Sequence, residues 1–177
     1  MSGGGTILLP IPTPEGSYSN EMKGYRLERE QIVPIPRDRA FSFFADPHNL
    51  VLLTPEFVNL RFIKDPPKIV TPGLLMDYRV RLYGLPLRWQ SRIESVDPPR
   101  EFLDIQTKGP YSYWHHRHTF EDAGSGATVI RDQVDYGLPL GPLGSIAYYL
   151  FVERSLREIF DFRERKLAEL IVGGFGG

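Results

Sequence analysis

Apolar and polar residues alternate along most of the chain with a period of two, which is typical of β-strands that cover a core with one face. The first alternating stretch is Tyr25–Val33, and Pro34 and Pro36 end it. Turn residues, mostly Pro, Gly and Asp, separate the later stretches. These stretches are Phe57–Ile63, Leu74–Tyr83, Leu87–Val96, Glu101–Thr107, Tyr113–Glu121 and Ala127–Tyr136. Short turns between consecutive strands predict an antiparallel sheet of about seven strands.

Helical patterns are expected in three places. Pro36 can begin a short helix that carries Phe41 and its apolar neighbours, and Pro47 can begin a second that carries Leu50–Leu53. Between Leu143 and Val172 there is no proline, and apolar residues recur at helical spacing. This stripe comprises Tyr149, Val152, Leu156, Ile159, Leu167 and Leu170, with Arg163 as a charged member. The pattern predicts a long C-terminal helix.

This order of elements predicts an α+β fold of the helix-grip type, a curved antiparallel sheet wrapped around the long C-terminal helix. Two short helices follow the first strand. We expect one domain over residues 24–172, with a flexible N-terminal tail over residues 1–23 and a glycine-rich tail over residues 173–177. A strongly curved sheet is not filled by its own side chains, so a cavity is expected between the sheet and the helix.

Composition narrows the function classes. The 177-residue chain has a formal net charge of -1, and its Lys and Arg residues are interspersed with acids, so we expect no nucleic-acid partner. It has no cysteine, which excludes disulfides and thiolate chemistry and fits a cytoplasmic location. The longest apolar run, Ile146–Val152, is too short for a transmembrane segment, and Met1–Pro14 does not have the pattern of a signal peptide.

The strand patterns also assign an inward face. On one strand the inward residues are Trp114, His116, His118 and Phe120, which places two imidazoles between two aromatic side chains. On the next strand the inward face includes a carboxylate, and its members are Ile130, Asp132, Val134 and Tyr136. Earlier strands contribute Met76, Tyr78 and Trp89. For Glu101–Thr107, alternation alone leaves both faces open.

Several spaced residues together resemble the ligand-binding SRPBCC proteins, the superfamily of START lipid-transfer domains, polyketide cyclases and the birch-pollen allergen. They are Phe102-x-Asp104-x-Gln106, Gly109-Pro110-Tyr111, Trp114-x-His116-x-His118-x-Phe120 and Asp132-x-Val134-x-Tyr136-x-x-Pro139. The resemblance covers Tyr25–Leu170. It implies the helix-grip fold, the binding of lipids, sterols, polyketides or similar molecules, and an inward position for Phe102, Asp104 and Gln106.

The strand register of the inward polar residues follows if the centres of two turns are assumed. If the first turn centres on Pro110, Asp104 lies opposite His116 and Gln106 opposite Trp114. If the second centres on Gly124, His116 lies opposite Asp132, and a shift of two residues brings in His118 instead. The expectation is a polar row, Asp104–His116–Asp132, that crosses three strands.

Three interpretations of this row remain open. It can be a self-satisfied network that holds the strand register and orients a ligand's polar end. It can be catalytic, with His116, His118 or Asp132 in acid–base roles. It can hold a metal through His116, His118 and Asp132. The metal is disfavoured because the superfamily generally binds ligands without one, so no metal and no cofactor are expected.

The favoured prediction is a protein that binds a small hydrophobic or amphipathic molecule. The alternatives are a cofactor-independent cyclase or dehydratase and a protein-interaction module with a collapsed cavity, and a homo-oligomer is compatible with the sequence. The predicted ligand-binding residues are Met76, Tyr78, Trp89, Phe102, Asp104, Gln106, Trp114, His116, His118, Phe120, Asp132, Val134 and Tyr136.

Overall fold

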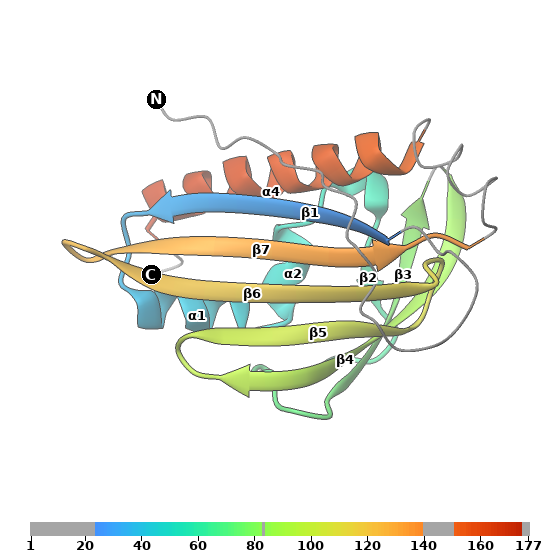
Figure 1. The fold of residues 1–177 in the computed structure, drawn as a ribbon, viewed down its shortest axis with the longest axis horizontal. Helices are drawn as coiled ribbons and strands as arrows, with labels where there is room; N and C mark the ends of the chain where they lie inside the picture. Colours follow the sequence, from blue (N-terminus) through green and yellow to red (C-terminus); the bar gives the residue numbers. More distant parts are fainter. Residues whose placement is uncertain (1–23, 83, 140–150, 175–177) are drawn as a thin grey trace.

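The computed structural model of the protein describes residues 24–82, 84–139 and 151–174. Within them the chain forms a strand, three short helices, six further strands and a long helix (Figure 1). The strands are β1 (Gly24–Val33), β2 (Arg61–Phe62), β3 (Leu75–Leu82), β4 (Leu85–Asp97), β5 (Glu101–Lys108), β6 (Tyr113–Gly124) and β7 (Ala127–Gly137). The helices are α1 (Arg37–Phe44), α2 (His48–Leu52), the 3-10 helix η1 (Glu56–Val58) and α4 (Glu153–Val172). The predicted helix-grip fold is confirmed.

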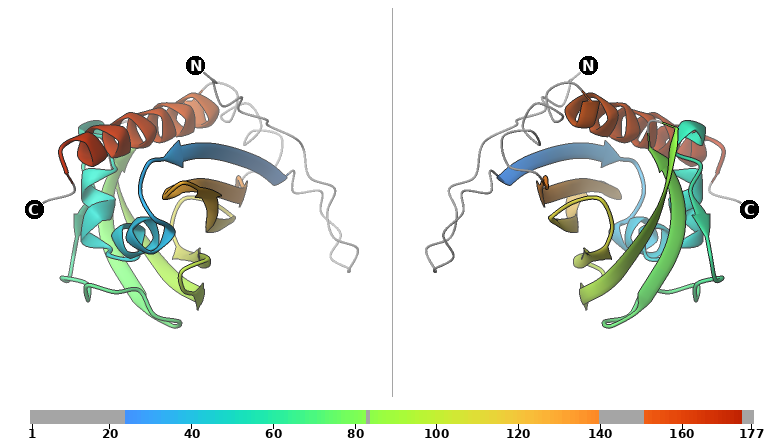
Figure 2. Two further views of the ribbon diagram at one scale, coloured as in Figure 1. Left: turned by 90° about the vertical axis from the view of Figure 1, so that its left-hand side faces the viewer. Right: turned by 90° about the vertical axis from the view of Figure 1, so that its right-hand side faces the viewer.

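The strands form one antiparallel sheet in the order β1-β7-β6-β5-β4-β3-β2. Strands β2 to β7 follow one another as neighbours, whereas β1 pairs with β7 from Gly24 opposite Gly137 to Val33 opposite Thr128. Figure 2 shows how strongly the sheet curves, with α1 and α2 on its concave side and α4 across its open side. The concave side is therefore covered by helices, and residues facing it are shielded from solvent.

Strict alternation places one face of the central strands in the core. On β7, alternate residues from Thr128 to Tyr136 are buried. Helix α1 packs against this face through Phe41, whose ring meets those of Phe102 and Phe120 edge-on at centroid distances of 6.1 and 5.5 Å. Such edge-to-face contacts are a favourable geometry for aromatic rings. Helix α1 thus fills part of the hollow that the curved sheet leaves open.

The predicted strand Phe57–Ile63 is wrong over most of its length. Its first residues belong to the 3-10 helix η1, and only the two-residue strand β2 pairs with β3. The backbone explains the difference, because Asn59 at the end of η1 has a φ of 45°, in the left-handed region that a strand cannot contain. Phe57 is consequently half exposed.

The long C-terminal helix is confirmed from Glu153 to Val172, and the earlier part of the predicted helix lies outside the described residues. Its buried residues are Leu156, Phe160, Arg163 and Leu167. The predicted stripe omits Phe160, which is buried. It includes Ile159, which is only half-buried. No described helix is both long and apolar enough to cross a membrane. The predicted tail 1–23 and residues 175–177 also lie outside the described residues.

One buried hydrogen bond fixes the connection between β1 and α1 to the sheet. The hydroxyl of Thr128 is fully buried and donates to the carbonyl oxygen of Ile35 at 2.7 Å. We expect Thr128→Val to lower the free energy of unfolding by about 1–3 kcal/mol, because it leaves that carbonyl buried without its donor. Urea unfolding measures the change. Thr119→Val, on the opposite face of β6, is the matched control, and an equal loss in both variants would contradict this role for Thr128.

Candidate functional site

The registers of β5, β6 and β7 bring the inward polar residues together. Asp104 lies opposite His116, as predicted. Asp132, however, lies opposite His118 and not His116, which is the two-residue shift that the sequence leaves open. The cause is the β6–β7 turn, which is centred on Ser125 with Gly124 and Gly126 on either side, all three at positive φ, and which follows an irregularity after Asp122.

Pairing of β5 with β6 also ends earlier than predicted. It stops at Ile105 opposite His115, one residue before Gln106 would meet Trp114. The Gln106 side chain instead turns toward the β5–β6 loop, where its amide nitrogen donates to the carbonyl oxygen of Tyr111 at 2.8 Å. Gln106 therefore stabilises the loop.

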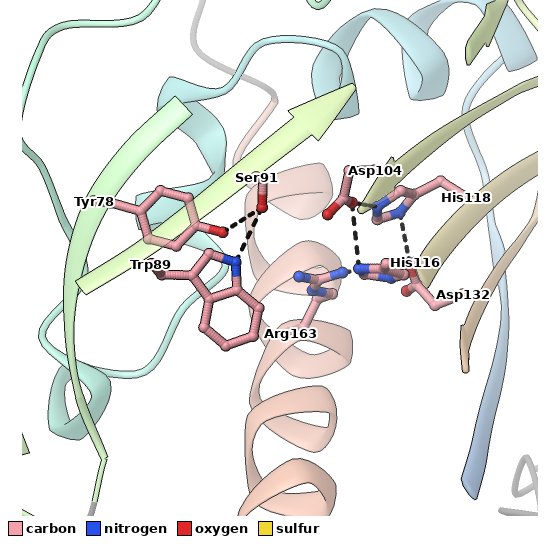
Figure 3. A network of polar contacts seen from close by, with 8 residues as sticks. All are labelled: Tyr78, Trp89, Ser91, Asp104, His116, His118, Asp132 and Arg163. Atoms are coloured by element: carbon pink, nitrogen blue, oxygen red, sulfur yellow. Dashed lines mark hydrogen bonds and ion pairs between the residues drawn. The ribbon is translucent and has the colours of Figure 1, made fainter. Parts of the chain in front are cut away.

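The two imidazoles lie between two carboxylates (Figure 3). On one side, Oδ1 of Asp132 accepts a hydrogen bond from His116 Nε2 at 3.0 Å and lies 2.7 Å from His118 Nδ1. On the other side, Oδ2 of Asp104 lies 3.7 Å from His116 Nδ1 and 3.4 Å from His118 Nε2. Arg163 of α4 adds a charged donor, with NH1 3.3 Å from Asp132 Oδ1. Each imidazole thus has one nitrogen toward each carboxylate.

Burial and charge shift these groups in different directions. Burial, helped by the neighbouring His118, lowers the pKa of His116 to about 4. Burial also acts to lower the pKa of His118, but the contacts with Asp104 and Asp132 outweigh it, so this pKa is raised. Burial alone would raise the pKa of Asp132, yet Arg163 and the two imidazoles hold it well below its usual range. When His116 and His118 together hold one proton, that proton therefore resides on His118.

This cluster forms part of the wall of a pocket. The pocket has a volume of about 170 Å³ and lies between β3–β6, α4 and the segment from α1 to η1. Asp104, His116, His118 and Arg163 all line it. Most of the remaining wall is apolar, including Leu53, Val58, Met76, Val80, Ile93, Trp114, Leu156 and Phe160. An apolar pocket with a few convergent polar groups is the usual form of a small-molecule site.

A second polar group lies on the sheet wall of the same pocket (Figure 3). Ser91 Oγ is 2.8 Å from the hydroxyl of Tyr78 and accepts a hydrogen bond from Trp89 Nε1 at 3.1 Å. Burial, with the nearby charge of Asp104, raises the pKa of Tyr78, so its phenol is neutral. These three side chains hydrogen-bond to one another, and all three line the pocket.

Comparison with known proteins assigns the family. Residues 33–160 match the model of the family described as polyketide cyclase / dehydrase and lipid transport. The chain belongs to this family. Membership confirms the resemblance to SRPBCC proteins inferred from the spaced motifs. No curated protein matches the sequence.

Solved structures share the family's fold at low sequence identity. The Zhui aromatase/cyclase from Streptomyces sp. R1128 is 17% identical, with a TM-score of 0.63 over 87% of this chain and 99% of that one. Norcoclaurine synthase from Thalictrum flavum, in complex with dopamine and hydroxybenzaldehyde, is 16% identical, with a TM-score of 0.60 over 90% and 98%. A START superfamily protein from Mycobacterium smegmatis is 12% identical, with a TM-score of 0.62 over 82% and 98%. At such identities these likenesses support the fold alone.

In this member of the polyketide cyclase and lipid transport family, the predicted site residues divide into two groups. Eight of them line the pocket: Met76, Tyr78, Trp89, Phe102, Asp104, Trp114, His116 and His118. The other five are not part of its lining: Gln106, Phe120, Asp132, Val134 and Tyr136. Asp132 lies behind the imidazoles, and Phe120, Val134 and Tyr136 are fully buried under the wall. Alternation identifies an inward residue, but it does not distinguish packed core from pocket surface.

The predicted ligand-binding residues include none from α4 or from the α1–η1 segment, although both supply part of the pocket wall. Phe44, Leu53 and Val58 lie in a region whose strand and helix patterns are short. For Arg163 the sequence does carry a signal, because it is a charge on an otherwise apolar helical stripe. A charge at a core position of a helix is costly to bury alone and so predicts an acidic partner, and in the structure buried Arg163 contacts Asp132.

Proposed function

We propose that the protein binds a small hydrophobic or amphipathic molecule, lipid-, sterol- or polyketide-like, in the pocket between the sheet and α4. The observation that carries this proposal is the composition of the pocket wall, which is mostly apolar with a compact polar cluster in one place. Burial of apolar ligand surface supplies most of the affinity in such a site. Family membership supports the same class of ligand.

The polar cluster sets the orientation of the ligand. His116 and His118 lie beside Asp104 on the pocket wall, and an unpaired polar group in the apolar remainder of the pocket would be costly to bury. A ligand with one polar end is therefore expected to direct that end toward these three side chains. Its apolar body would contact Met76 and Trp89 on the sheet.

Narrowing the pocket tests the proposal. Ile159 lines the pocket from α4, and Ile159→Trp is expected to raise the Kd of an amphipathic dye such as anilinonaphthalene sulfonate at least tenfold, because the larger ring occupies ligand space. Ile171→Trp, on the same helix and outside the pocket, is the matched control and is expected to change the Kd less than twofold. Fluorescence titration measures both, with a fatty acid, a sterol and an aromatic polyketide as competitors.

Two outcomes of this titration would contradict the proposal. One is the absence of saturable binding for the dye and all three competitors. The other is an equal effect of the two tryptophan substitutions, which would place the dye outside the pocket.

A second candidate function is cyclisation or dehydration of the bound molecule. The observation that favours it is the direct contact of His116 and His118 with a carboxylate on the pocket wall, an arrangement suited to moving protons. We expect His116→Phe to retain binding of the apolar competitors within a few-fold and to abolish turnover of a polyketide-like substrate. His115→Phe, on the outer face of β6, is the control. Turnover that persists in His116→Phe would exclude His116 as the acid or base.

A further inference from the structure

We propose that Asp104, His116 and His118 bind a divalent first-row transition-metal ion at the pocket wall. This inference goes beyond ligand binding and does not depend on it. Within the described residues, these three side chains form a group whose candidate ligand atoms all lie within 4.8 Å of one another. The sequence disfavours a metal and offers His116, His118 and Asp132 only as an alternative, whereas in the structure Asp104 takes the place of Asp132.

Strand geometry brings the three ligand atoms together. His116 and His118 are two residues apart on β6 and project from the same face, and Asp104 on β5 lies directly opposite His116. The Oδ2 atom of Asp104 is 3.7 Å from His116 Nδ1 and 3.4 Å from His118 Nε2. Ligand atoms about 2.0–2.2 Å from one ion lie roughly 3.0–3.5 Å apart in octahedral or tetrahedral geometry. The two edges to Asp104 are therefore close to these values, and the third edge, between the two imidazole nitrogens, is no longer than 4.8 Å, so a bound ion would draw the two rings together.

The surroundings of the imidazoles are those of metal ligands. On the side away from Asp104, His116 Nε2 donates to Oδ1 of Asp132 at 3.0 Å, and His118 Nδ1 lies 2.7 Å from the same oxygen. A carboxylate on the far nitrogen is the usual outer partner of a metal-bound histidine, because it fixes the ring and makes the ligating nitrogen more basic. Phe102 stacks on His118 with ring centroids 4.3 Å apart, which restrains the ring further. Both rings are thus held with one nitrogen aimed at Asp104.

The site is also accessible from one side. All three residues line the pocket, while Asp132 and β7 close the opposite side of the imidazoles. Two imidazoles and one carboxylate on one side of an ion leave its other positions open toward the pocket. This donor set suits Zn²⁺, Fe²⁺, Co²⁺ or Ni²⁺ and not Mg²⁺ or Ca²⁺, which prefer oxygen ligands. A ligand whose polar end is a carbonyl or a carboxylate would reach such an ion.

Cobalt titration of the metal-free protein tests the proposal. After treatment with a chelator, the protein is expected to bind one Co²⁺ per chain with a visible absorption band, and Zn²⁺ is expected to displace it. Asp104→Ala and His118→Ala are each expected to weaken Co²⁺ binding at least 30-fold. Asp132→Asn, which changes the outer partner of the imidazoles, is expected to weaken it 10- to 100-fold. His115→Ala, on the outer face of β6, is expected to leave it unchanged.

Failure of this proposal is distinguishable from failure of ligand binding. Circular dichroism and dye binding on the same samples report whether each variant is folded and its pocket intact. A folded protein that binds the dye but takes up neither Co²⁺ nor Zn²⁺ would overturn the metal site alone. Binding that survives unchanged in both Asp104→Ala and His118→Ala would also overturn it. A rise in melting temperature with Zn²⁺ in the unmodified protein, absent from His118→Ala, is the second supporting result, and no rise overturns the proposal.

Discussion

Replacing Asp132 with leucine is expected to lower the free energy of unfolding by about 3–5 kcal/mol. Asp132 is buried, and its Oδ1 accepts hydrogen bonds from His116 Nε2 and Arg163 NH1 and lies 2.7 Å from His118 Nδ1. Without it, the guanidinium of Arg163 remains buried without its acidic partner, and removal of one partner of a buried ion pair is strongly destabilising. Urea unfolding at neutral pH, in the presence of a chelator, measures the loss.

Two further variants separate the buried charge from the general effect of removing a carboxylate. Asp135→Leu removes a neighbouring carboxylate that pairs with Arg26 on the outer face of β7, and it should cost about 1 kcal/mol or less because that pair is partly exposed to solvent. Adding Arg163→Met to Asp132→Leu should recover part of the lost stability, because the uncompensated charge is then gone. Equal losses for Asp132→Leu and Asp135→Leu would contradict the account of the cluster.

Stability of the metal-free protein is expected to pass through a maximum near pH 6.5 and to fall on both sides. In the folded protein burial lowers the pKa of His116 to about 4, so the unfolded chain binds more protons between pH 6.5 and 4. Stability is therefore lost as pH falls through this range, by about 3 kcal/mol at most. His118 has a raised pKa, so its contribution to the free energy of unfolding is fully present below pH 6.5. This contribution is lost as the pH rises through the pKa of His118 in the folded protein.

Urea unfolding at a series of pH values checks this profile. His116→Phe is expected to flatten the slope between pH 6.5 and 4, whereas His115→Phe is expected to retain it, because His115 is exposed. Asp132 has a lowered pKa, so the stability that its carboxylate contributes is lost only below the pH range in which carboxyl groups ordinarily titrate. That loss does not overlap the slope between pH 6.5 and 4. A profile in His116→Phe that matches the unmodified protein would show that His116 is not the group responsible.

Most of the fold prediction rests on the alternation of apolar and polar residues, and this pattern gives the wrong element where the chain is irregular. β7 has an alternating inward face, so Thr128 to Tyr136 could be assigned from the sequence. Phe57–Ile63 also alternates in part, yet the left-handed Asn59 interrupts it, and a single residue in this conformation is not visible in hydrophobic periodicity.

The candidate site was predictable in its members and less so in its contacts. His116, His118 and Asp104 were identified as inward, and they line the pocket. The imidazole that lies directly opposite Asp132 in the strand register depends on the centre of a glycine-rich turn, and an error of one residue at that centre shifts the pairing by two. The contact between Asp132 and Arg163 joins the sheet to α4, and such a distant pairing leaves no local pattern in the sequence.

We propose above all that the pocket holds a small, largely apolar molecule. Native mass spectrometry of the protein purified from its own source, followed by solvent extraction and identification of what is released, tests it most directly. We expect a stoichiometric adduct with an apolar body and one polar end, lost or strongly reduced in Ile159→Trp and retained in Ile171→Trp. A protein that carries no adduct, and that acquires none from fatty acids, sterols or aromatic polyketides, would contradict it.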